Sequence, residues 1–191
     1  MIVLLYPVKL LIWTFIYCII GYRFIEYLFY LDKEDLNMSS CFFIGHRDAP
    51  ASILPQLIRE AECHVTEYAV TDFYVGHYGI FDQLAGKAVI QLKERFPDIR
   101  LYRVIPYHPA ERPIQTPNGY DGSYYPPNME NVPRRFAIPR ANRSLIDTSD
   151  YLIAYVCHPA SNAYEILRYA KMQEKKGLIQ VVNLGDKDDL L

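Results

Sequence analysis

Apolar residues follow two alternating patterns from Cys41 onward. Short, almost continuous apolar runs predict buried strands, and stretches in which apolar residues recur every three or four positions predict helices with one apolar face. The expected strands are CFFI (41–44), DFYV (72–75), IRLYRVIPY (99–107), YLIAYV (151–156) and LIQVVNL (178–184). The expected helices cover residues 53–70, 81–96, 141–150 and 162–175.

This alternation predicts an α/β fold. Strands that are apolar along their whole length are typical of a parallel sheet covered by helices on both faces. We therefore expect a doubly wound, Rossmann-like parallel sheet of about five strands in a single domain, residues 38–185. The stretch 107–131 is rich in proline and glycine and is expected to be a long irregular loop. Residues 186–191 form an acidic tail.

The N-terminal segment is different in kind. Residues 2–22 carry one charge, Lys9, and a helix of that length, rising ~1.5 Å per residue, reaches across the ~30 Å membrane core. Pro7 and Lys9 interrupt the segment, charged residues follow it at once, and it lacks the small-residue cleavage site of a signal peptide. Two interpretations stay open for residues 1–37: a membrane anchor on a cytoplasmic domain, or translated sequence upstream of a start at Met38.

Composition narrows the function classes. An apolar share of 51% and a charged share of 22% describe a globular protein. The net charge is -2 and the basic residues are dispersed along the chain, so binding to a long nucleic acid is not expected.

The cysteines show no CxxC spacing, and Cys41 and Cys157, within or beside apolar runs, are expected to be reduced and buried. Neighbouring residues on a strand or helix point in different directions, so the Cys63-His64 and Cys157-His158 pairs do not predict a metal site. No metal or cofactor is expected.

Candidate chemistry follows the ends of the strands. In an open parallel sheet, ligands bind outside the carboxyl ends of the strands, where helix N-termini attract anions. Four of the five histidines lie in these turns. The candidate ligand-binding residues there are Gly45, His46, Arg47, Gly76, Gly79, Asp82, Ser161 and Asn162, with Glu165 one helical turn further on.

Plainer explanations stay open for these residues. Tight turns alone would account for Gly45 and Gly76, and Arg47 and Glu165 could be solvated surface charges. The sequence contains neither a GxGxxG fingerprint nor a P-loop, so neither standard phosphate-binding motif is predicted.

Four stretches resemble a known family when taken in order. CFFIGHRDAP, FYVGHYGIFDQLA, VPRRFAIPRANRSLIDTSDYLIAYV and KKGLIQVVNL, between Ser40 and about Leu184, are similar to the SLOG superfamily. This Rossmann-like group includes the LOG phosphoribohydrolases and the DNA-processing protein DprA, and the similarity is to its small stand-alone bacterial and phage members. The resemblance implies a pocket for a nucleotide or nucleotide-derived ligand, a start at Met38 and, as in many relatives, a homodimer. It adds Asn142 to the ligand-binding residues and assigns Asp150 to the aspartate before the fourth predicted strand.

The resemblance also shows departures. LOG enzymes cleave the N-glycosidic bond of nucleoside monophosphates with an arginine and a glutamate that follows a PGGxGT loop. Here Ala141 occupies the arginine position, flanked by Arg140 and Arg143, and HPASNAYE replaces the loop, with Glu165 near the expected carboxylate. We therefore expect binding or sensing of a nucleotide-like small molecule. The alternative is a phosphoribohydrolase that uses Glu165, Arg143 and Arg140.

Overall fold

Strands and helices alternate through the part of the chain that the computed structural model describes, residues 39–110 and 115–185. The interpretations of residues 1–37 and 186–191 fall outside these ranges. In chain order the elements are β1 (Ser39–Gly45), a short 3-10 turn η1 (Ala51–Ile53), α2 (Leu54–Tyr68), β2 (Val70–Val75), α3 (Ile80–Lys93), β3 (Arg100–Val104), β4 (Gly122–Tyr124), α4 (Arg134–Thr148), β5 (Tyr151–Tyr155), α5 (Asn162–Glu174) and β6 (Gln180–Asn183).

The sheet has six parallel strands in the order β4-β3-β2-β1-β5-β6. From β1 the chain winds outward through β2, β3 and β4, and then returns to the other side of β1 to form β5 and β6. The strand order therefore reverses between β1 and β5, which is where ligands bind in doubly wound folds. The predicted doubly wound Rossmann-like fold is confirmed.

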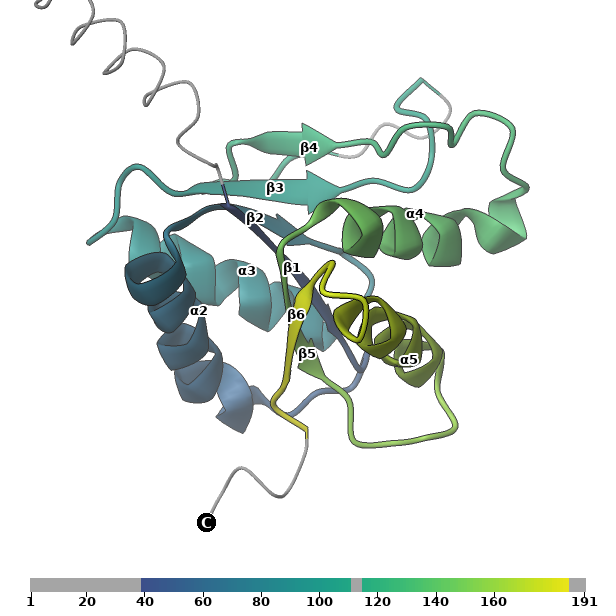
Figure 1. Cartoon of the computed structure of the whole chain (residues 1–191). Helices are drawn as coiled ribbons and strands as arrows, with labels where there is room; N and C mark the ends of the chain where they lie inside the picture. The colour runs from purple at the N-terminus through teal and green to yellow at the C-terminus, as the bar shows by residue number, and fades with distance from the viewer. Residues whose placement is uncertain (1–38, 111–114, 186–191) are drawn as a thin grey trace, which may run out of the picture. The chain divides into compact units, whose positions relative to one another are not determined.

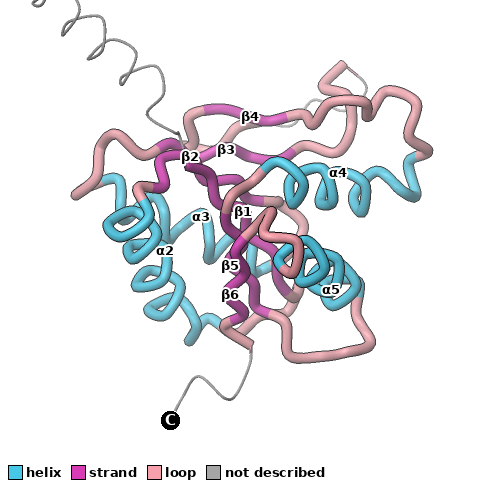
Figure 2. Tube along the Cα trace, in the orientation of Figure 1, coloured by secondary structure: helices cyan, strands magenta, loops and turns pink. Residues whose placement is uncertain are grey.

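Helices cover both faces of the sheet, with α2 and α3 on one face and α4 and α5 on the other (Figures 1 and 2). Successive residues of β1 enter opposite cores: Phe43 packs with the α2 and α3 side and Phe42 with the α4 and α5 side. Both side chains are almost fully buried. This two-sided burial explains why the strands read as continuous apolar runs.

The sixth strand, β4, lies inside the stretch that the sequence predicted to be an irregular loop. It pairs with β3 from Tyr102 opposite Gly122 to Val104 opposite Tyr124. Asp121 fixes its start: its Oδ2 accepts 2.7 Å from the Leu101 N-H and 2.6 Å from Lys93 Nζ. Three residues are too few to show a strand period, so the pairing depends on this tertiary contact.

Helix α4 begins at Arg134, seven residues before the predicted start. Pro139 lies within it, and a proline at such a position is a signal for a helix break because it lacks the N-H that would bond four residues back. The buried residues Ala137, Ala141 and Leu145 recur at helical spacing across the proline. Their packing against the sheet outweighs the lost hydrogen bond, so the prediction of a helix confined to 141–150 was too short.

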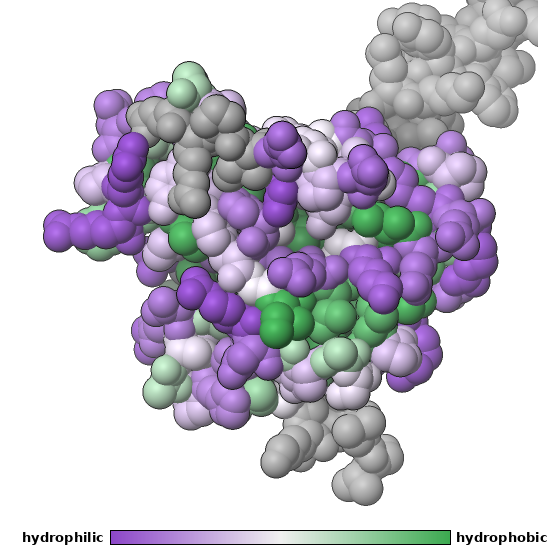
Figure 3. All heavy atoms as spheres, turned by 180° about the vertical axis from the view of Figure 1, so that it is seen from behind, coloured by the Kyte–Doolittle hydropathy of each residue, from purple (hydrophilic) through white to green (hydrophobic). Residues whose placement is uncertain are grey.

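The face of the molecule seen from behind is mainly polar, and apolar side chains gather there in a limited band (Figure 3). Within the described ranges no helix combines the length and apolar character needed to span a membrane. Cys41 is buried as expected, but Cys157 is exposed. The expectation failed there because β5 ends at Tyr155, which places Cys157 in the following loop.

Candidate functional site

A cavity of about 600 Å³ opens beside the carboxyl ends of β1 and β2, between α4 and the first turn of α5. Its wall brings together eleven of the residues that the sequence singled out: Gly45, His46, Arg47, Gly76, Gly79, Asp82, Asn142, Arg143, Ser161, Asn162 and Glu165. They come from four separate segments of the chain. The edge of the sheet that the sequence indicated is thus the edge at which the cavity lies.

Arg140 is the candidate that the structure does not bring to the cavity. The wall contributed by α4 consists of Arg135, Ile138, Pro139, Asn142 and Arg143, which follow the spacing of one helix face. Arg140 lies on another face of the same helix and is exposed. The suggestion that Arg140 holds a phosphate in this cavity is therefore not supported by its position.

Arg135 is a cavity residue that sequence reasoning missed. It lies eight positions before Arg143, on the same face of α4, but the predicted helix began too late to include it. Asp150, by contrast, lies just before β5, at the amino end of the sheet. Its Oδ2 accepts from the Ser40 N-H at 2.8 Å, so it ties β1 to β5 away from the cavity.

The turns after β1 and β2 pack directly on each other. A Cβ atom at Gly79 would lie 2.7 Å from the Cα of Arg47, and one at Gly45 would collide with the ring of Phe81. The carbonyl of Arg47 also accepts from the Ile80 N-H at 2.8 Å. Close packing of the protein on itself therefore explains Gly45 and Gly79 without a ligand.

Asp82 holds the second turn in place. Its Oδ2 accepts from the backbone N-H groups of Tyr78 at 2.8 Å and Gly79 at 3.2 Å, at the start of α3. Burial raises the pKa of this carboxyl, and the two N-H donors partly oppose that shift. Gly76 is needed here too, because a Cβ would lie 2.8 Å from Asp82 Oδ2. Asp82 is thus a structural carboxylate in the cavity wall.

The first turn of α5 offers hydrogen-bond donors to the cavity. Ser161 caps the helix: its Oγ accepts from the Tyr164 N-H at 3.1 Å and donates to the His158 carbonyl at 2.9 Å. The N-H groups of Asn162 and Ala163 have no hydrogen-bond partner among the residues that the structure describes. Both residues line the cavity, at the positive end of the helix dipole.

Three arginines, Arg47, Arg135 and Arg143, line the same cavity as this helix end. The guanidinium of Arg143 lies over the ring of Tyr169, 5.4 Å from its centre, and that of Arg135 lies over Phe136 at 4.6 Å. Among the residues that the structure describes, neither guanidinium has an anionic partner, so the N-H donors of both are available to a ligand.

The carboxylate of Glu165 is on the cavity wall but is not sequestered there. Its Oε2 accepts from the guanidinium of Arg168 at 2.7 Å, one helical turn away, and its side chain is 55% exposed. Arg168 and the surrounding solvent both screen the charge of Glu165. Glu165 therefore has a weaker electrostatic effect on a ligand in the cavity than an unpaired carboxylate would have.

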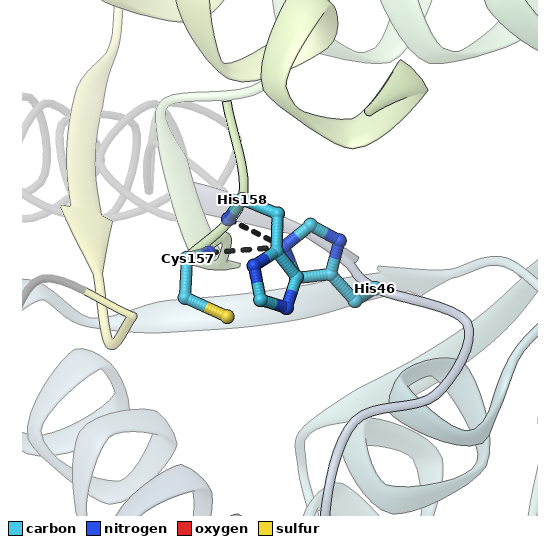
Figure 4. A group of neighbouring side chains, drawn as sticks. All are labelled: His46, Cys157 and His158. Carbon is cyan, nitrogen blue, oxygen red and sulfur yellow. Dashed lines mark hydrogen bonds between the residues drawn. The ribbon is translucent and has the colours of Figure 1, made fainter. Parts of the chain in front are cut away.

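His46, Cys157 and His158 form a cluster beside the cavity, with candidate metal-ligating atoms within 4.8 Å of one another (Figure 4). The Nε2 of His46 accepts from the N-H groups of Cys157 at 2.9 Å and His158 at 3.2 Å. An unprotonated imidazole nitrogen has a single lone pair, so a metal ion at this atom would displace both donors. Burial, followed by the nearby His158, lowers the pKa of His46. The hydrogen bonds of His46 thus hold the backbone of the loop after β5 in place.

Comparison with protein-family models and with curated proteins finds no match for this chain. The resemblance to the SLOG superfamily stays a prediction.

Proposed function

We propose that the cavity binds a nucleotide or a nucleotide-derived ligand, with a phosphate group at the N-terminus of α5. The observation that carries the proposal is the pair of N-H groups at Asn162 and Ala163, which have no partner within the described ranges and belong to the wall shared with Arg143. Helix N-termini combined with arginines are a recurrent arrangement for phosphate recognition.

The remaining wall suits the rest of such a molecule. Ile44, Ile138 and Ile166 give the cavity an apolar surface on which a planar base can pack. Its volume of about 600 Å³ lies in the range typical of small-molecule sites, roughly 300 to 1,000 Å³. Charged and apolar surfaces together fit an amphipathic ligand better than they fit free phosphate.

Thermal-shift and calorimetric titrations with AMP, NAD and ADP-ribose test the proposal, with adenosine as the phosphate-free control. We expect stabilisation by at least one phosphorylated ligand and little by adenosine. Arg143→Ala should weaken binding by about tenfold or more, as expected for a lost charge-assisted contact.

Arg140→Ala is the matched control for this titration. It removes the same charge from the same helix but on a face outside the cavity, so its affinity should stay near that of the wild type. Absence of binding by all three ligands would contradict the proposal. Equal losses in the Arg140 and Arg143 variants would show that the effect is one of general charge and not of contact.

The second candidate function is hydrolysis of a nucleoside monophosphate, and the presence of Glu165 on the cavity wall favours it. In such a reaction a carboxylate stabilises the oxocarbenium-like transition state while water replaces the base, giving free base and ribose 5-phosphate. Incubation with a panel of nucleoside monophosphates, followed by chromatography, should then reveal free base. Glu165→Gln should abolish its release, whereas binding without base release supports the sensing role.

A further inference from the structure

The hydrogen bonds of His46 determine which of its ring nitrogens carries the proton. Backbone N-H groups can only donate, so the Nε2 atom that receives them from Cys157 and His158 must be the unprotonated acceptor. In a neutral imidazole the proton is then on Nδ1. The loop after β5 thus locks His46 in a single tautomer.

The surroundings favour the neutral form of the ring by lowering the pKa of His46. His46 is 7% exposed, and the ring of His158 lies 4.9 Å away between centres. The ring of Tyr155 lies almost perpendicular to that of His46, with centres 6.3 Å apart, and Asp48 opposes the lowering of the pKa of His46 by a smaller effect. A proton on Nε2 would also point at two N-H donors and leave both without an acceptor.

The locked tautomer leaves one donor available. Figure 4 shows Nδ1 on the side of the ring turned away from the two bonded N-H groups. Within residues 39–110 and 115–185, Nδ1 has no hydrogen-bond partner, and this atom is not fully buried. His46 lines the cavity, so a ligand bound there can approach this side chain.

We infer that His46 is a specificity residue that donates a hydrogen bond from Nδ1 to an acceptor oxygen of the bound ligand. The inference rests on the proposed function and deepens it. His46 would contribute a directional hydrogen bond from an uncharged group, whereas the arginines would contribute positive charge. A ligand that offers a donor at this position would oppose the Nδ1-H and be rejected.

Two substitutions separate the two nitrogens. In His46→Gln the side-chain carbonyl can reach the place of Nε2 and accept from the two backbone N-H groups, but the donor at Nδ1 is lost. In His46→Asn the amide occupies the place of Nδ1 and can still donate, while the backbone N-H groups lose their acceptor. We expect His46→Gln to melt near the wild-type temperature and to bind the best ligand among AMP, NAD and ADP-ribose about tenfold more weakly.

His46→Asn should show the reverse pattern, with a lower melting temperature and an affinity closer to that of the wild type. If the wild type binds and His46→Gln binds equally well, the donor role is overturned while the proposed function stands.

Nitrogen-15 NMR of the histidine side chains at pH 7 tests the tautomer without any ligand. We expect a protonated Nδ1 and an unprotonated Nε2 at His46, and a change in the Nδ1 signal on ligand addition. A protonated Nε2 would overturn the inference. If the tautomer is as expected but none of the three ligands binds, the proposed function fails and the donor role fails with it.

A cobalt(II) titration supplies the remaining alternative outcome. A thiolate-to-metal absorption band that disappears in Cys157→Ser and His46→Gln, but persists in the control Cys63→Ser, would make His46 a metal ligand. That result would contradict the donor role. Absence of the band agrees with the lone pair already being engaged by the two backbone N-H groups.

Discussion

Replacement of Asp82 by alanine tests how the turn after β2 is held. The change removes the acceptor of two backbone hydrogen bonds, at 2.8 Å from Tyr78 and 3.2 Å from Gly79. Bonds to a charged acceptor each contribute about 1.5–3 kcal/mol, and the second is long enough to count for less. Removing a buried carboxylate also recovers part of its desolvation penalty. We therefore expect a net loss of about 2 kcal/mol in the free energy of unfolding.

Urea denaturation followed by circular dichroism measures this loss. With a denaturant slope of roughly 1–3 kcal/mol/M, a loss of about 2 kcal/mol lowers the midpoint by about 1 M. Glu165→Ala is the control, because its exposed, screened ion pair predicts a change within about 0.5 kcal/mol. Asp82→Asn keeps one acceptor oxygen, so its loss in the free energy of unfolding should fall between those of Asp82→Ala and Glu165→Ala. An Asp82→Ala protein as stable as the wild type would refute the structural role assigned to this carboxylate.

Three further predictions concern buried histidines, a tightly packed glycine and the exposure of two cysteines. Burial lowers the pKa of His46 and His64, so the unfolded state takes up protons more readily, and the free energy of unfolding should fall as the pH drops below about 6.5 in urea titrations. Gly45→Ala should lose about 1–3 kcal/mol by overpacking, measured by thermal melting; an unchanged melt would contradict the packing. In the native protein Cys157 should react with a thiol reagent, whereas Cys41 should react only after unfolding.

The fold could be predicted because its strands are buried on both faces. Continuous apolar runs such as Cys41–Ile44 leave a parallel sheet between two helical layers as the natural arrangement. The strand β4 could not be predicted, because three residues carry no period and Asp121 supplies the contact that fixes it.

The location of the cavity could be predicted better than the roles of the residues that line it. The rule that ligands bind at the carboxyl ends of strands indicated the edge at which the cavity lies, but only the position of each arginine around helix α4 shows that Arg143 lines the cavity and Arg140 does not. The sequence could not show which face of the helix each arginine occupies, because α4 begins at Arg134 and continues across Pro139, whereas the predicted helix began at Ala141. The backbone hydrogen bonds of His46 have no sequence signal, since they join residues 111 and 112 positions apart.

Backbone amide NMR during a titration with AMP, NAD or ADP-ribose tests the central claim most directly. We expect the N-H signals of Asn162 and Ala163 to shift more than those of helix α2, which covers the other face of the sheet. With adenosine, the signals of Asn162 and Ala163 should not shift. Unchanged signals at these two residues in the presence of a ligand that binds would contradict a phosphate site at the N-terminus of α5.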